Sequence, residues 1–308
     1  MNKFLILFVS VMMLMACDED STTSPSASEP SSESISVDFR VDSTFDLVRC
    51  SEELDGKIAF VKKDSTWLVC KLYVEDDSKF WFWRSYVYVN GKLYPYADVP
   101  AGSYDCNVNK CVSTEYLNPN ITYGEYQDYR DHKVYKTVHI GKQLWMAQNL
   151  VYTDGNDSLT GANLFSEDSL KKGYYYLASD PCPGGWKVPT RKDIAELVEF
   201  TGDKTMNVLK SSKESWIVGD TELTDPYGFS LVKSAYIIYI TEDEDYYRNG
   251  LLMRGEKFER GASLWLERNN SVQTWYIQIY NTNQNYSIAP DSPENVYMTV
   301  RCIAKKGY

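Results

Sequence analysis

The stretch CPGGWKVPTRKDIAELVEFTG, residues 182–202, contains the clearest local fold signal in the chain. A helix is expected to begin after Pro189, because Thr190 is a good N-cap and Asp193 lies three residues beyond it. The apolar positions 194, 197 and 198 follow the spacing of one helix face, and Gly202 supplies an end. The sequence therefore predicts one short amphipathic helix, a few residues after a cysteine.

Runs that alternate or are rich in β-branched residues predict strands on both sides of this helix. Before it, the run 134–140 places Val138 and Ile140 on one face and Thr137 and His139 on the other. After it, strands are expected at residues 234–241, 263–266, 274–280 and 297–303. The predicted class is α+β, with strands predominating.

Residues 40–115 form a separate small β module in this interpretation. Strands are expected at 58–61, 67–74 and 80–89, and Asn90-Gly91 is a hairpin signal. Both faces of the strand 80–89 carry apolar side chains, which favours burial on both sides over an exposed contact surface. Residues 116–130 have little periodicity, and the second domain is placed at 116–308.

The N-terminus has the features of a bacterial lipoprotein signal. Lys3 precedes an apolar run that ends at Ala16 and is too short to span a membrane. The residues LMAC, 14–17, resemble a lipobox, which implies removal of residues 1–16 and attachment of a diacylglycerol to Cys17. Residues 17–39 are rich in Ser, Pro and acidic residues and predict a disordered tether. The lipid would hold the chain in the cell envelope, at the outer membrane or the cell surface.

Six cysteines remain beside Cys17, and an even number in an exported chain indicates disulfide bonds. Six cysteines allow 15 pairings. The spacing favours two local pairs, Cys50–Cys70 and Cys106–Cys111, and one long-range pair, Cys182–Cys302. A zinc site is a weaker interpretation, because the paired Cys-x-x-Cys spacing of a structural zinc site is missing.

Five segments carry a further signal: VYKTVHIGKQLWMAQNL (134–150), CPGGWKVPT (182–190), VLKSS (208–212), DPYGFS (225–230) and TVRCI (299–303). In this order they resemble the Fibrobacter succinogenes major paralogous domain, a family of surface and secreted bacterial modules. The resemblance covers about residues 120–308 and leaves the tether and the β module outside. The family usually has Gly where His132 stands, so an altered turn is expected there.

At a greater distance, the helix start and the closing Val300-Arg301-Cys302 resemble C-type-lectin-like and sulfatase-modifying-factor-like folds. That resemblance implies an α+β domain of this type, preceded by a small disulfide-stapled β module. It also implies that the first and last parts of the domain lie together, which supports the pair Cys182–Cys302. The oxidase relatives need a reactive cysteine pair late in the domain, and only Cys302 follows Cys182 here, so their chemistry is not expected.

The sequence contains no recognisable catalytic or cofactor motif. With His132 and His139 as its two histidines, it excludes most zinc-protease and Ser-His-Asp sites, and it lacks P-loop and dinucleotide-binding patterns. The run from Asp154 fails as an EF-hand, because Leu159 stands where glycine is required. A carboxylate pair of the glycosidase type depends on three-dimensional spacing and stays open. No metal, cofactor or enzymatic activity is expected, and a formal net charge of −11 opposes binding to nucleic acid.

Aromatic side chains are abundant, with 25 Tyr and 8 Trp, and they suit the recognition of sugars or proteins as well as sheet packing. Trp145, Trp186 and Trp216 lie beside the recurring segments and are expected in the core. A ligand site is placed in the divergent stretch 236–280, because loops on a fixed scaffold commonly carry recognition. Its candidate residues are Asp243, Asp245, Tyr246, Tyr247 and Trp275, with Trp265 and Tyr276 in the same stretch.

These features favour a non-enzymatic, surface-exposed lipoprotein that serves as a binding or adhesion module for polysaccharide. A structural envelope protein that contacts other proteins is the alternative. An enzyme is disfavoured, because no nucleophile, metal cluster or cofactor motif is recognisable. The expected partners are a membrane, through the lipid, and a polysaccharide or a surface protein.

Overall fold

The computed structural model describes the chain from Ile35 onward, with gaps. The described residues are 35–63, 65–75, 78–153, 173–176, 180–234, 236–239, 255–258, 261–267, 274–291 and 296–306. The predicted signal peptide, Cys17 and nearly all of the tether lie outside them. Contacts within the chain separate Met1–Ser36 from Val37–Tyr308. Among the described residues, no helix is long and apolar enough to cross a membrane.

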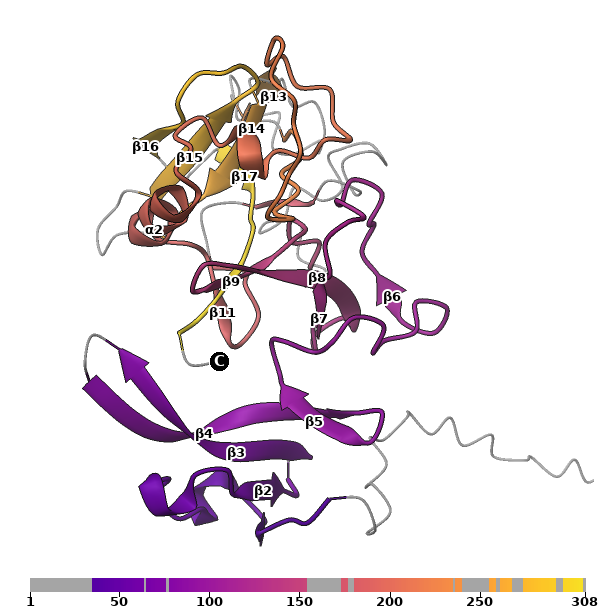
Figure 1. The fold of residues 1–308 in the computed structure, drawn as a ribbon, viewed down its shortest axis with the longest axis vertical. Coiled ribbons are helices and arrows are strands. Elements are labelled where there is room, and N and C mark those ends of the chain that lie inside the picture. The colour runs from indigo at the N-terminus through magenta and orange to yellow at the C-terminus, as the bar shows by residue number, and fades with distance from the viewer. Residues whose placement is uncertain are drawn as a thin grey trace, which may run out of the picture. The chain divides into compact units, whose positions relative to one another are not determined.

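The first sheet has five strands in the order β1-β2-β3-β4-β5 (Figure 1). The strands are β1 (Phe39–Val41), β2 (Ile58–Val61), β3 (Thr66–Glu75), β4 (Ser78–Val89) and β5 (Lys92–Pro95). β1 runs parallel to β2, and the other neighbours are antiparallel. The predicted hairpin is confirmed, because Asn90 and Gly91 join β4 to β5 with positive φ angles of 50° and 82°, as a two-residue type I′ turn requires.

One face of this sheet, which we call face A, is partly covered by the segment between β1 and β2. That segment contains two short 3₁₀ helices, η1 (Thr44–Asp46) and η2 (Glu52–Leu54). It is fixed to the sheet by the disulfide Cys50–Cys70, and the indole of Trp83 donates a hydrogen bond to the carbonyl of Val48 at 2.8 Å. The small buried cluster of face A consists of Ala59, Val61 and Leu68.

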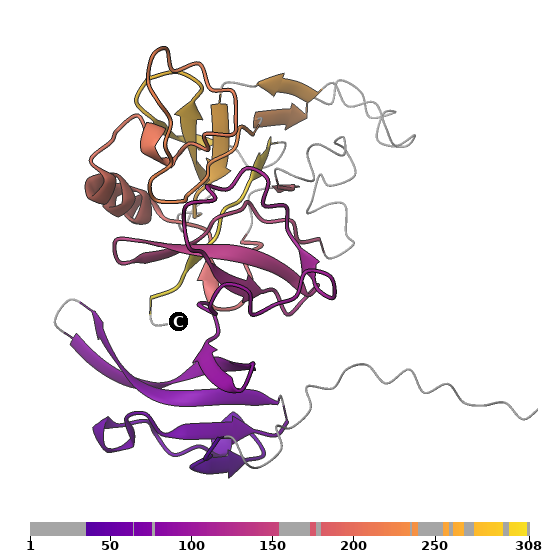
Figure 2. The ribbon, with the colours of Figure 1, turned by 45° about the vertical axis from the view of Figure 1, so that its right-hand side comes forward.

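The expectation that β4 is buried on both sides is wrong. Its side chains are half-buried from Trp81 to its end, and Phe80 is 52% exposed. The cause is that β3 and β4 extend past their neighbours, since β2 pairs with β3 only as far as Val69 and β5 pairs with β4 only from Tyr86. The end of this hairpin is therefore a two-stranded ribbon, which can be followed in Figure 1 and Figure 2.

The second sheet has the path β11-β18-β9-β8-β6, and β7 also pairs with β8. Its strands are β6 (Lys110–Cys111), β7 (Gly124–Gln127), β8 (Lys133–Ile140), β9 (Gln143–Met146), β11 (Trp186–Lys187) and β18 (Ile303–Ala304). β6 lies within residues 40–115 but pairs with β8. The predicted strand 134–140 is confirmed as β8.

Thr137 and His139 share one face of β8, but only His139 is exposed. Thr137 is fully buried because the neighbouring strand β7 comes close to it. A Cβ atom at Gly124 would lie 2.6 Å from the Thr137 hydroxyl oxygen. The absence of a side chain at Gly124 therefore allows β7 to pair with β8 at this position.

The third sheet has the path β13-β12-β17-β14-β15-β16, with β10 paired to β17. Its strands are β10 (Tyr175–Tyr176), β12 (Tyr236–Tyr239), β13 (Gly255–Phe258), β14 (Gly261–Trp265), β15 (Thr274–Tyr280), β16 (Ser287–Asp291) and β17 (Val296–Thr299). The predicted strands 234–241, 263–266 and 274–280 correspond to β12, β14 and β15. The predicted strand 297–303 is divided, because the chain leaves the third sheet after β17 and enters the second sheet at β18.

The predicted helix is confirmed as α2 (Arg191–Thr201). The Thr190 hydroxyl accepts a hydrogen bond from the Asp193 amide at 3.0 Å, and the Asp193 carboxylate accepts one from the Thr190 amide at 2.7 Å. Gly202 ends the helix with a left-handed φ of 67°. The predicted apolar stripe is buried and packs in one cluster with residues of the second and third sheets.

All three predicted disulfides are present: Cys50–Cys70, Cys106–Cys111 and Cys182–Cys302. The last one joins residues 120 positions apart in the sequence. Next to it, β11 and β18 pair antiparallel with Lys187 opposite Ile303. The first and last parts of the matched segments therefore lie together, as the distant resemblance implied.

The predicted α+β, C-type-lectin-like fold class is nevertheless wrong. The described residues form three β-sheets and a single α-helix, so the chain is mostly β. The prediction rested on the helix start and the closing segment, and these fix only the contact around the long-range disulfide. Between α2 and β12 the chain forms one 3₁₀ helix, η4 (Asn207–Leu209), and is otherwise irregular, because its many Gly, Pro, Asp and Ser residues favour turns.

Candidate functional site

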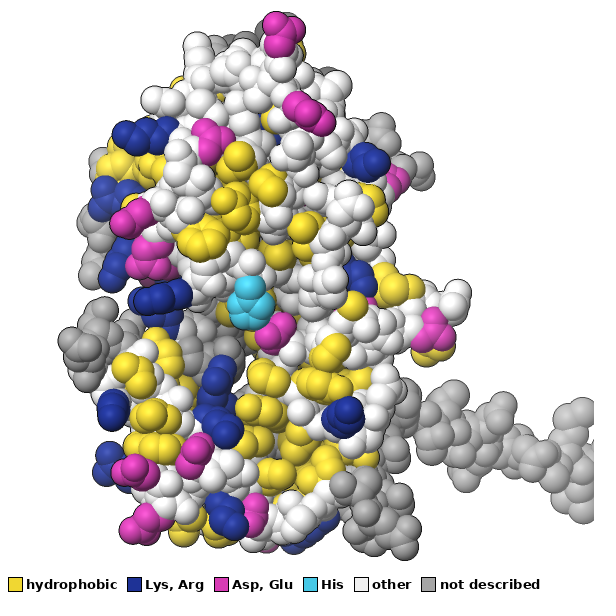
Figure 3. Space-filling model, in the orientation of Figure 1, with side chains coloured by type: hydrophobic (Ala, Val, Ile, Leu, Met, Phe, Trp, Pro, Cys, Tyr) yellow, Lys and Arg dark blue, Asp and Glu magenta, His cyan; other side chains and the backbone are white. Residues whose placement is uncertain are grey.

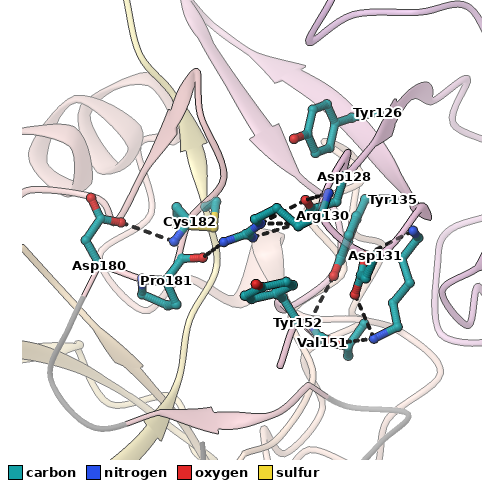
Figure 4. A network of polar contacts seen from close by, with 12 residues as sticks. Tyr126, Asp128, Arg130, Asp131, Tyr135, Val151, Tyr152, Asp180, Pro181 and Cys182 are labelled. Carbon is teal, nitrogen blue, oxygen red and sulfur yellow. Dashed lines mark hydrogen bonds and ion pairs between the residues drawn. A yellow bond between two sulfur atoms is a disulfide. The ribbon is translucent and has the colours of Figure 1, made fainter. Parts of the chain in front are cut away.

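An ion pair with a buried carboxylate connects the β7–β8 turn to the long-range disulfide (Figure 4). Arg130 Nε and Nη2 donate to the Asp128 carboxylate at 2.9 and 2.6 Å, and Nη1 donates to the carbonyl of Pro181 at 2.8 Å. Pro181 precedes Cys182, so this contact lies beside the disulfide. The guanidinium carbon also lies 3.6 Å from the ring centroid of Tyr152.

This network holds the chain together and offers little to a ligand. The Asp128 side chain has no exposed surface, and it accepts hydrogen bonds from the backbone and the guanidinium of Arg130. Burial by itself lowers the pKa of Arg130. The hydrogen bonds and charge of the Asp128 carboxylate act in the opposite direction, and the net result is a raised pKa. The guanidinium therefore stays charged and bound to Asp128 across the physiological range.

A second polar cluster, which we call the Arg301 cluster, lies in the hydrophobic core. The Arg301 side chain is fully buried; Nε donates to Asn149 Oδ1 at 2.9 Å, and Nη1 donates to the carbonyl of Phe229. The Phe229 ring centroid lies 4.5 Å from the guanidinium carbon. The buried carboxylate of Asp225 interacts electrostatically with Arg301 and accepts hydrogen bonds from the amide and hydroxyl of Ser230 at 3.1 and 2.6 Å.

Burial shifts the pKa of both charged groups in this cluster toward the neutral form. It raises the pKa of Asp225 from 3.8 to about 6, although the hydrogen bonds from Ser230 and the charge of Arg301 act in the opposite direction. It lowers the pKa of Arg301 to about 10. Shifts of this kind are common at functional sites, but here both side chains are closed off from solvent. The shifts therefore reflect the cost of burying charge in the core.

Lys210 is another fully buried charged residue. Its Nζ donates to Asn207 Oδ1 at 2.6 Å and to the carbonyl of Thr282 at 3.0 Å, and it lies 5.0 Å from the ring centroid of Trp216. Burial lowers the pKa of Lys210 to about 8. These contacts join η4 to the segment that follows β15, so Lys210 has a structural role.

The five segments that carry the family resemblance in the sequence lie next to one another in the structure. The Arg301 cluster joins three of them. The disulfide Cys182–Cys302 adds the fourth. The fifth is held by the amide of Leu231, the residue after the segment 225–230, which donates a backbone hydrogen bond of 2.8 Å to the carbonyl of Leu209. These segments form the internal framework of the domain.

Comparison with known families gives a match of the same extent as this framework. The family described as the Fibrobacter succinogenes major domain matches residues 138–304, a range that includes α2 and the strands from β9 to β18. The chain belongs to this family. No curated protein and no solved structure matches it.

Membership of the Fibrobacter succinogenes major domain family confirms the resemblance seen in the sequence. His132, which stands where the family usually has Gly, lies in the β7–β8 turn just before the matched range. Its φ of 59° is in the left-handed region that glycine adopts without strain. His132 therefore occupies a left-handed position in this turn.

The residues predicted to bind a ligand are described only in part. Asp243, Asp245, Tyr246 and Tyr247 lie outside the described residues and stay predictions. Trp275 in β15 is half-buried and packs against the core, and the guanidinium carbon of Arg191 lies 4.2 Å from its ring centroid. The indole ring of Trp275 therefore already has a cation over it.

Other tryptophans and histidines of the sequence analysis have structural or exposed positions. Trp265 is fully buried and donates to the carbonyl of Tyr176 at 2.6 Å. Trp145 and Trp186 are buried as predicted.

His139 Nε2 lies 2.9 Å from Asp98 Oδ2, and this hydrogen bond raises the pKa of His139. The two side chains are 59% and 41% exposed, so solvent screens the pair. In the described part of the chain, no group of three or more His, Cys, Asp or Glu residues could hold a metal ion.

A row of aromatic side chains lies on the other face of the first sheet, which we call face B. The register places Phe60, Trp67 and Tyr86 side by side on β2, β3 and β4. The Phe60 and Trp67 ring centroids are 4.9 Å apart, and Tyr88 stacks on Trp67 at 5.8 Å. Phe60 and Trp67 are buried, whereas Tyr86 and Tyr88 are half-buried. The row is therefore accessible where it reaches β4.

Face B continues toward the end of the β3–β4 hairpin. Tyr73 packs edge-on against Phe82 with ring centroids 5.9 Å apart, and Phe80 follows on the same face. Figure 3 shows hydrophobic side chains over the strands of this sheet, with Lys, Arg, Asp and Glu side chains among them. Face B therefore carries aromatic side chains along the β3–β4 hairpin.

Among the side chains that the structure describes, the charged ones on face B are mainly cations. Arg40 lies 5.6 Å from the Phe60 ring centroid, and Lys71 forms an exposed ion pair with Asp55 at 3.4 Å. Arg84 lies opposite Val69, and its Nε is buried without a hydrogen-bond partner among the described residues. Face B thus combines aromatic rings with positive charge.

The buried cations Arg301 and Lys210 were not predicted from the sequence. Their available signal was a basic residue next to apolar or cysteine neighbours, as in Leu209-Lys210 and Val300-Arg301-Cys302. Face B was not predicted either, because alternation in β4 does not show how far the flanking strands extend.

Proposed function

We propose that this protein is a lipid-anchored surface protein of the cell envelope that binds polysaccharide through face B. The observation that supports this proposal is the pair of half-buried side chains Tyr86 and Tyr88, with Phe82 and Tyr73 farther along the same face, beyond Arg84. Neighbouring strands are about 4.8 Å apart, and alternate residues of a strand are about 6.8 Å apart. Rings at these spacings can stack on successive sugars of an extended chain, and tyrosine hydroxyls can bond to sugar hydroxyls.

The charge of face B favours a polysaccharide that carries carboxylates. Arg40, Lys71 and Arg84 lie on this face, although the whole chain has a net charge of −11. A uronate carboxylate could accept charge-assisted hydrogen bonds from these side chains, and such bonds are stronger than those between neutral groups. We therefore propose a uronate-containing polysaccharide as the ligand.

The lipid anchor belongs to the same proposal. It is supported by the apolar N-terminal run, by Cys17 after Ala16, and by membership of a family known from surface and secreted modules. The absence of enzymatic activity is also proposed. It is supported by the burial of three charged side chains whose pKa values are shifted by that burial, Asp225, Arg301 and Lys210.

A structural envelope protein that contacts other proteins is the second candidate. It is favoured by exposed aliphatic side chains on the hairpin, where Leu72 is 37% and Val74 is 53% exposed. Such side chains suit protein contacts better than the ring stacking and hydrogen bonds that sugars need.

Isothermal titration of the purified full-length protein with polygalacturonate and with a neutral β-glucan tests the proposal. We expect the polyuronate to bind more tightly. The double variant Tyr86→Ala/Tyr88→Ala should weaken binding at least about tenfold, which corresponds to about 1.4 kcal/mol. Tyr129→Ala, which removes a 59% exposed tyrosine outside the first sheet, is the matched control and should bind as the wild type does.

Thermal unfolding of each variant separates lost binding from lost folding. Unchanged affinity in a folded double variant would overturn the assignment of face B. Failure to bind any glycan, together with reproducible crosslinking to a protein of the envelope, would favour the second candidate.

A further inference from the structure

The strand β4 has an open edge on the side opposite β3. β5 pairs only with Tyr86–Val89, and Tyr96 extends this pairing by one hydrogen bond of 3.1 Å from its amide to the Ser85 carbonyl. From Ser78 to Arg84, no strand among the described residues pairs with this edge. In this seven-residue stretch of β4, every second residue therefore presents backbone groups that pair with no strand among the described residues.

The direction of these backbone groups follows from the contact at Ser85. Backbone N–H and C=O groups alternate between the two sides of a strand. Because the Ser85 carbonyl points toward β5, the N–H and C=O groups of Trp83, Trp81 and Lys79 point toward the open edge. Hydrophobic side chains surround it, since Phe80 is 52% exposed and the following side chains are half-buried. An open, hydrophobic edge of this kind readily pairs with another strand.

We propose that this edge pairs antiparallel with the same edge of a second copy of the chain, centred on Trp81. Trp81 then lies opposite Trp81 of the second copy, and Lys79 lies opposite Trp83. On the other face, Phe80 lies opposite Phe82. Aromatic rings thus meet aromatic rings, and the lysine meets an indole ring, a favourable cation–π pair.

The length of the open edge selects this register. An antiparallel pairing centred on Trp81 uses residues 78–84 of each copy, which is the whole unpaired part of β4. Centred on Phe80, the pairing would be limited to residues 78–82 unless residues 76 and 77, which precede β4, joined it. Centred on Phe82, it would be limited to residues 80–84, because the Ser85 carbonyl already accepts the Tyr96 amide. A two-fold interface of this kind is self-complementary and closes on itself.

The inference goes beyond polysaccharide binding and does not depend on it. The interface uses the edge of β4, whereas the proposed sugar contacts use its face. Pairing would join two five-stranded sheets into one continuous sheet, with face B of the two copies side by side.

Sedimentation velocity of the full-length protein over a range of concentrations tests the proposal. We expect a reversible dimer that Trp81→Lys converts to a monomer, because two lysines would then face each other at the two-fold axis. Val74→Lys places the same charge on an exposed position of β3 away from the edge and should leave the dimer intact. A wild type that stays monomeric, or a Trp81→Lys variant that still dimerises, would overturn the inference.

Cysteine crosslinking tests the register and does not depend on the charge variant. In a hydrogen-bonded antiparallel pair the Cα atoms are about 5.5 Å apart, which suits a disulfide. Trp81→Cys should therefore form a covalent dimer on oxidation, whereas Phe80→Cys should not, because position 80 lies opposite position 82. Equal crosslinking of both variants would refute the register.

Amide hydrogen exchange identifies a different occupant of the edge. Protection of the Trp81 amide that rises with protein concentration agrees with pairing between copies. Protection that does not change with concentration would mean that another segment of the same chain covers the edge, and the inference would be wrong.

Discussion

Charged side chains in the core explain much of what single residues do in this domain. Arg301 donates to Asn149 and Phe229, while its Nη2 is buried without a partner among the described residues, and Asp225 accepts from Ser230. Removing one member of such a buried set is costly, because it leaves a polar group without a partner in an apolar environment. These buried charges therefore depend on their hydrogen-bond partners, and each partner lies in or beside one of the five family segments.

We expect the contribution of Asp225 to stability to fall as the pH rises from about 4 to about 7. Its pKa in the folded state, about 6, lies above the usual value of 3.8, so folding favours the protonated form. The contribution is fully present below the lower pKa and is lost as the pH rises through the higher one. The two values correspond to a difference of about 3 kcal/mol.

The test compares the free energy of unfolding of the wild type and Asp225→Asn in urea across this pH range. The amide cannot ionise, so the variant should lose this part of the pH dependence and be the more stable protein near neutral pH. Asp220→Asn changes an exposed carboxylate and should keep the wild-type profile. Parallel profiles for the wild type and Asp225→Asn would contradict the prediction.

At the scale of elements, local signals determine α2, while its packing depends on distant residues. The capping box of Thr190 and Asp193 and the left-handed Gly202 lie in one continuous stretch. The salt bridge from Lys187 to Asp193, at 2.7 Å, further holds the capping carboxylate. The position of Arg191 over Trp275, in contrast, joins residues far apart in sequence.

Thr190→Ala should destabilise the protein by about 1 kcal/mol, because the Asp193 amide loses the hydroxyl that caps it. Chemical denaturation measures the change. Thr190→Ser keeps the cap and should retain most of the stability, and Ser212→Ala, at an exposed turn hydroxyl, should have little effect. A loss of the same size in the serine variant would show that the methyl group of Thr190, and not its hydroxyl, matters.

The sequence was sufficient for elements whose signals are local. Helix α2, the Asn90-Gly91 hairpin and most strands follow from spacing within a few residues. It was insufficient for the exposure of β4, which depends on where β2 and β5 end. The fold class failed for a related reason, because two local similarities near Cys182 and Cys302 do not determine how the intervening chain is arranged.

For the candidate site, the sequence indicated aromatic recognition but not its position. Tyr86 and Tyr88 look like core residues in the sequence, and only the strand register places them on an accessible face. Trp265 looked like a candidate for contact and is buried. Alternation assigns a side chain to one of two faces, but the packing of other segments decides which face is open.

At the scale of the whole molecule, disulfides and the family framework act together. The bond Cys182–Cys302 encloses 120 positions and Cys106–Cys111 only 5. Longer loops lose more freedom in the unfolded state, so the long-range bond should contribute about 5 kcal/mol and the short one about 2 on the loop-entropy model.

Replacing Cys182 and Cys302 together by alanine should therefore destabilise the protein about 3 kcal/mol more than replacing Cys106 and Cys111 together. Equilibrium unfolding of both double variants provides the measurement, and thiol counting on the denatured, unreduced wild type confirms that the six cysteines are oxidised. Equal losses of stability would mean that strain or cavities, and not loop length, determine the effect.

Cys17→Ala should release the protein from membranes or block its maturation, because Cys17 is the residue that the lipobox resemblance assigns to the lipid. Metabolic labelling with a fatty-acid analogue, followed by membrane fractionation, measures both effects. The variant Cys17→Ala leaves the other six cysteines in place. A check that it folds as the wild type does therefore serves as the internal control. Equal labelling of the wild type and the variant would refute the lipid assignment.

The bond Cys182–Cys302 has a consequence for proteolysis. A protease that cuts once anywhere between these cysteines produces two fragments that stay covalently joined, and the second-sheet pairing of β11 with β18 lies beside the joint. A nicked molecule should therefore migrate as one band on a gel without reductant and as two bands with it. In an environment rich in secreted proteases, the protein could be cleaved between the two cysteines and still remain in one piece.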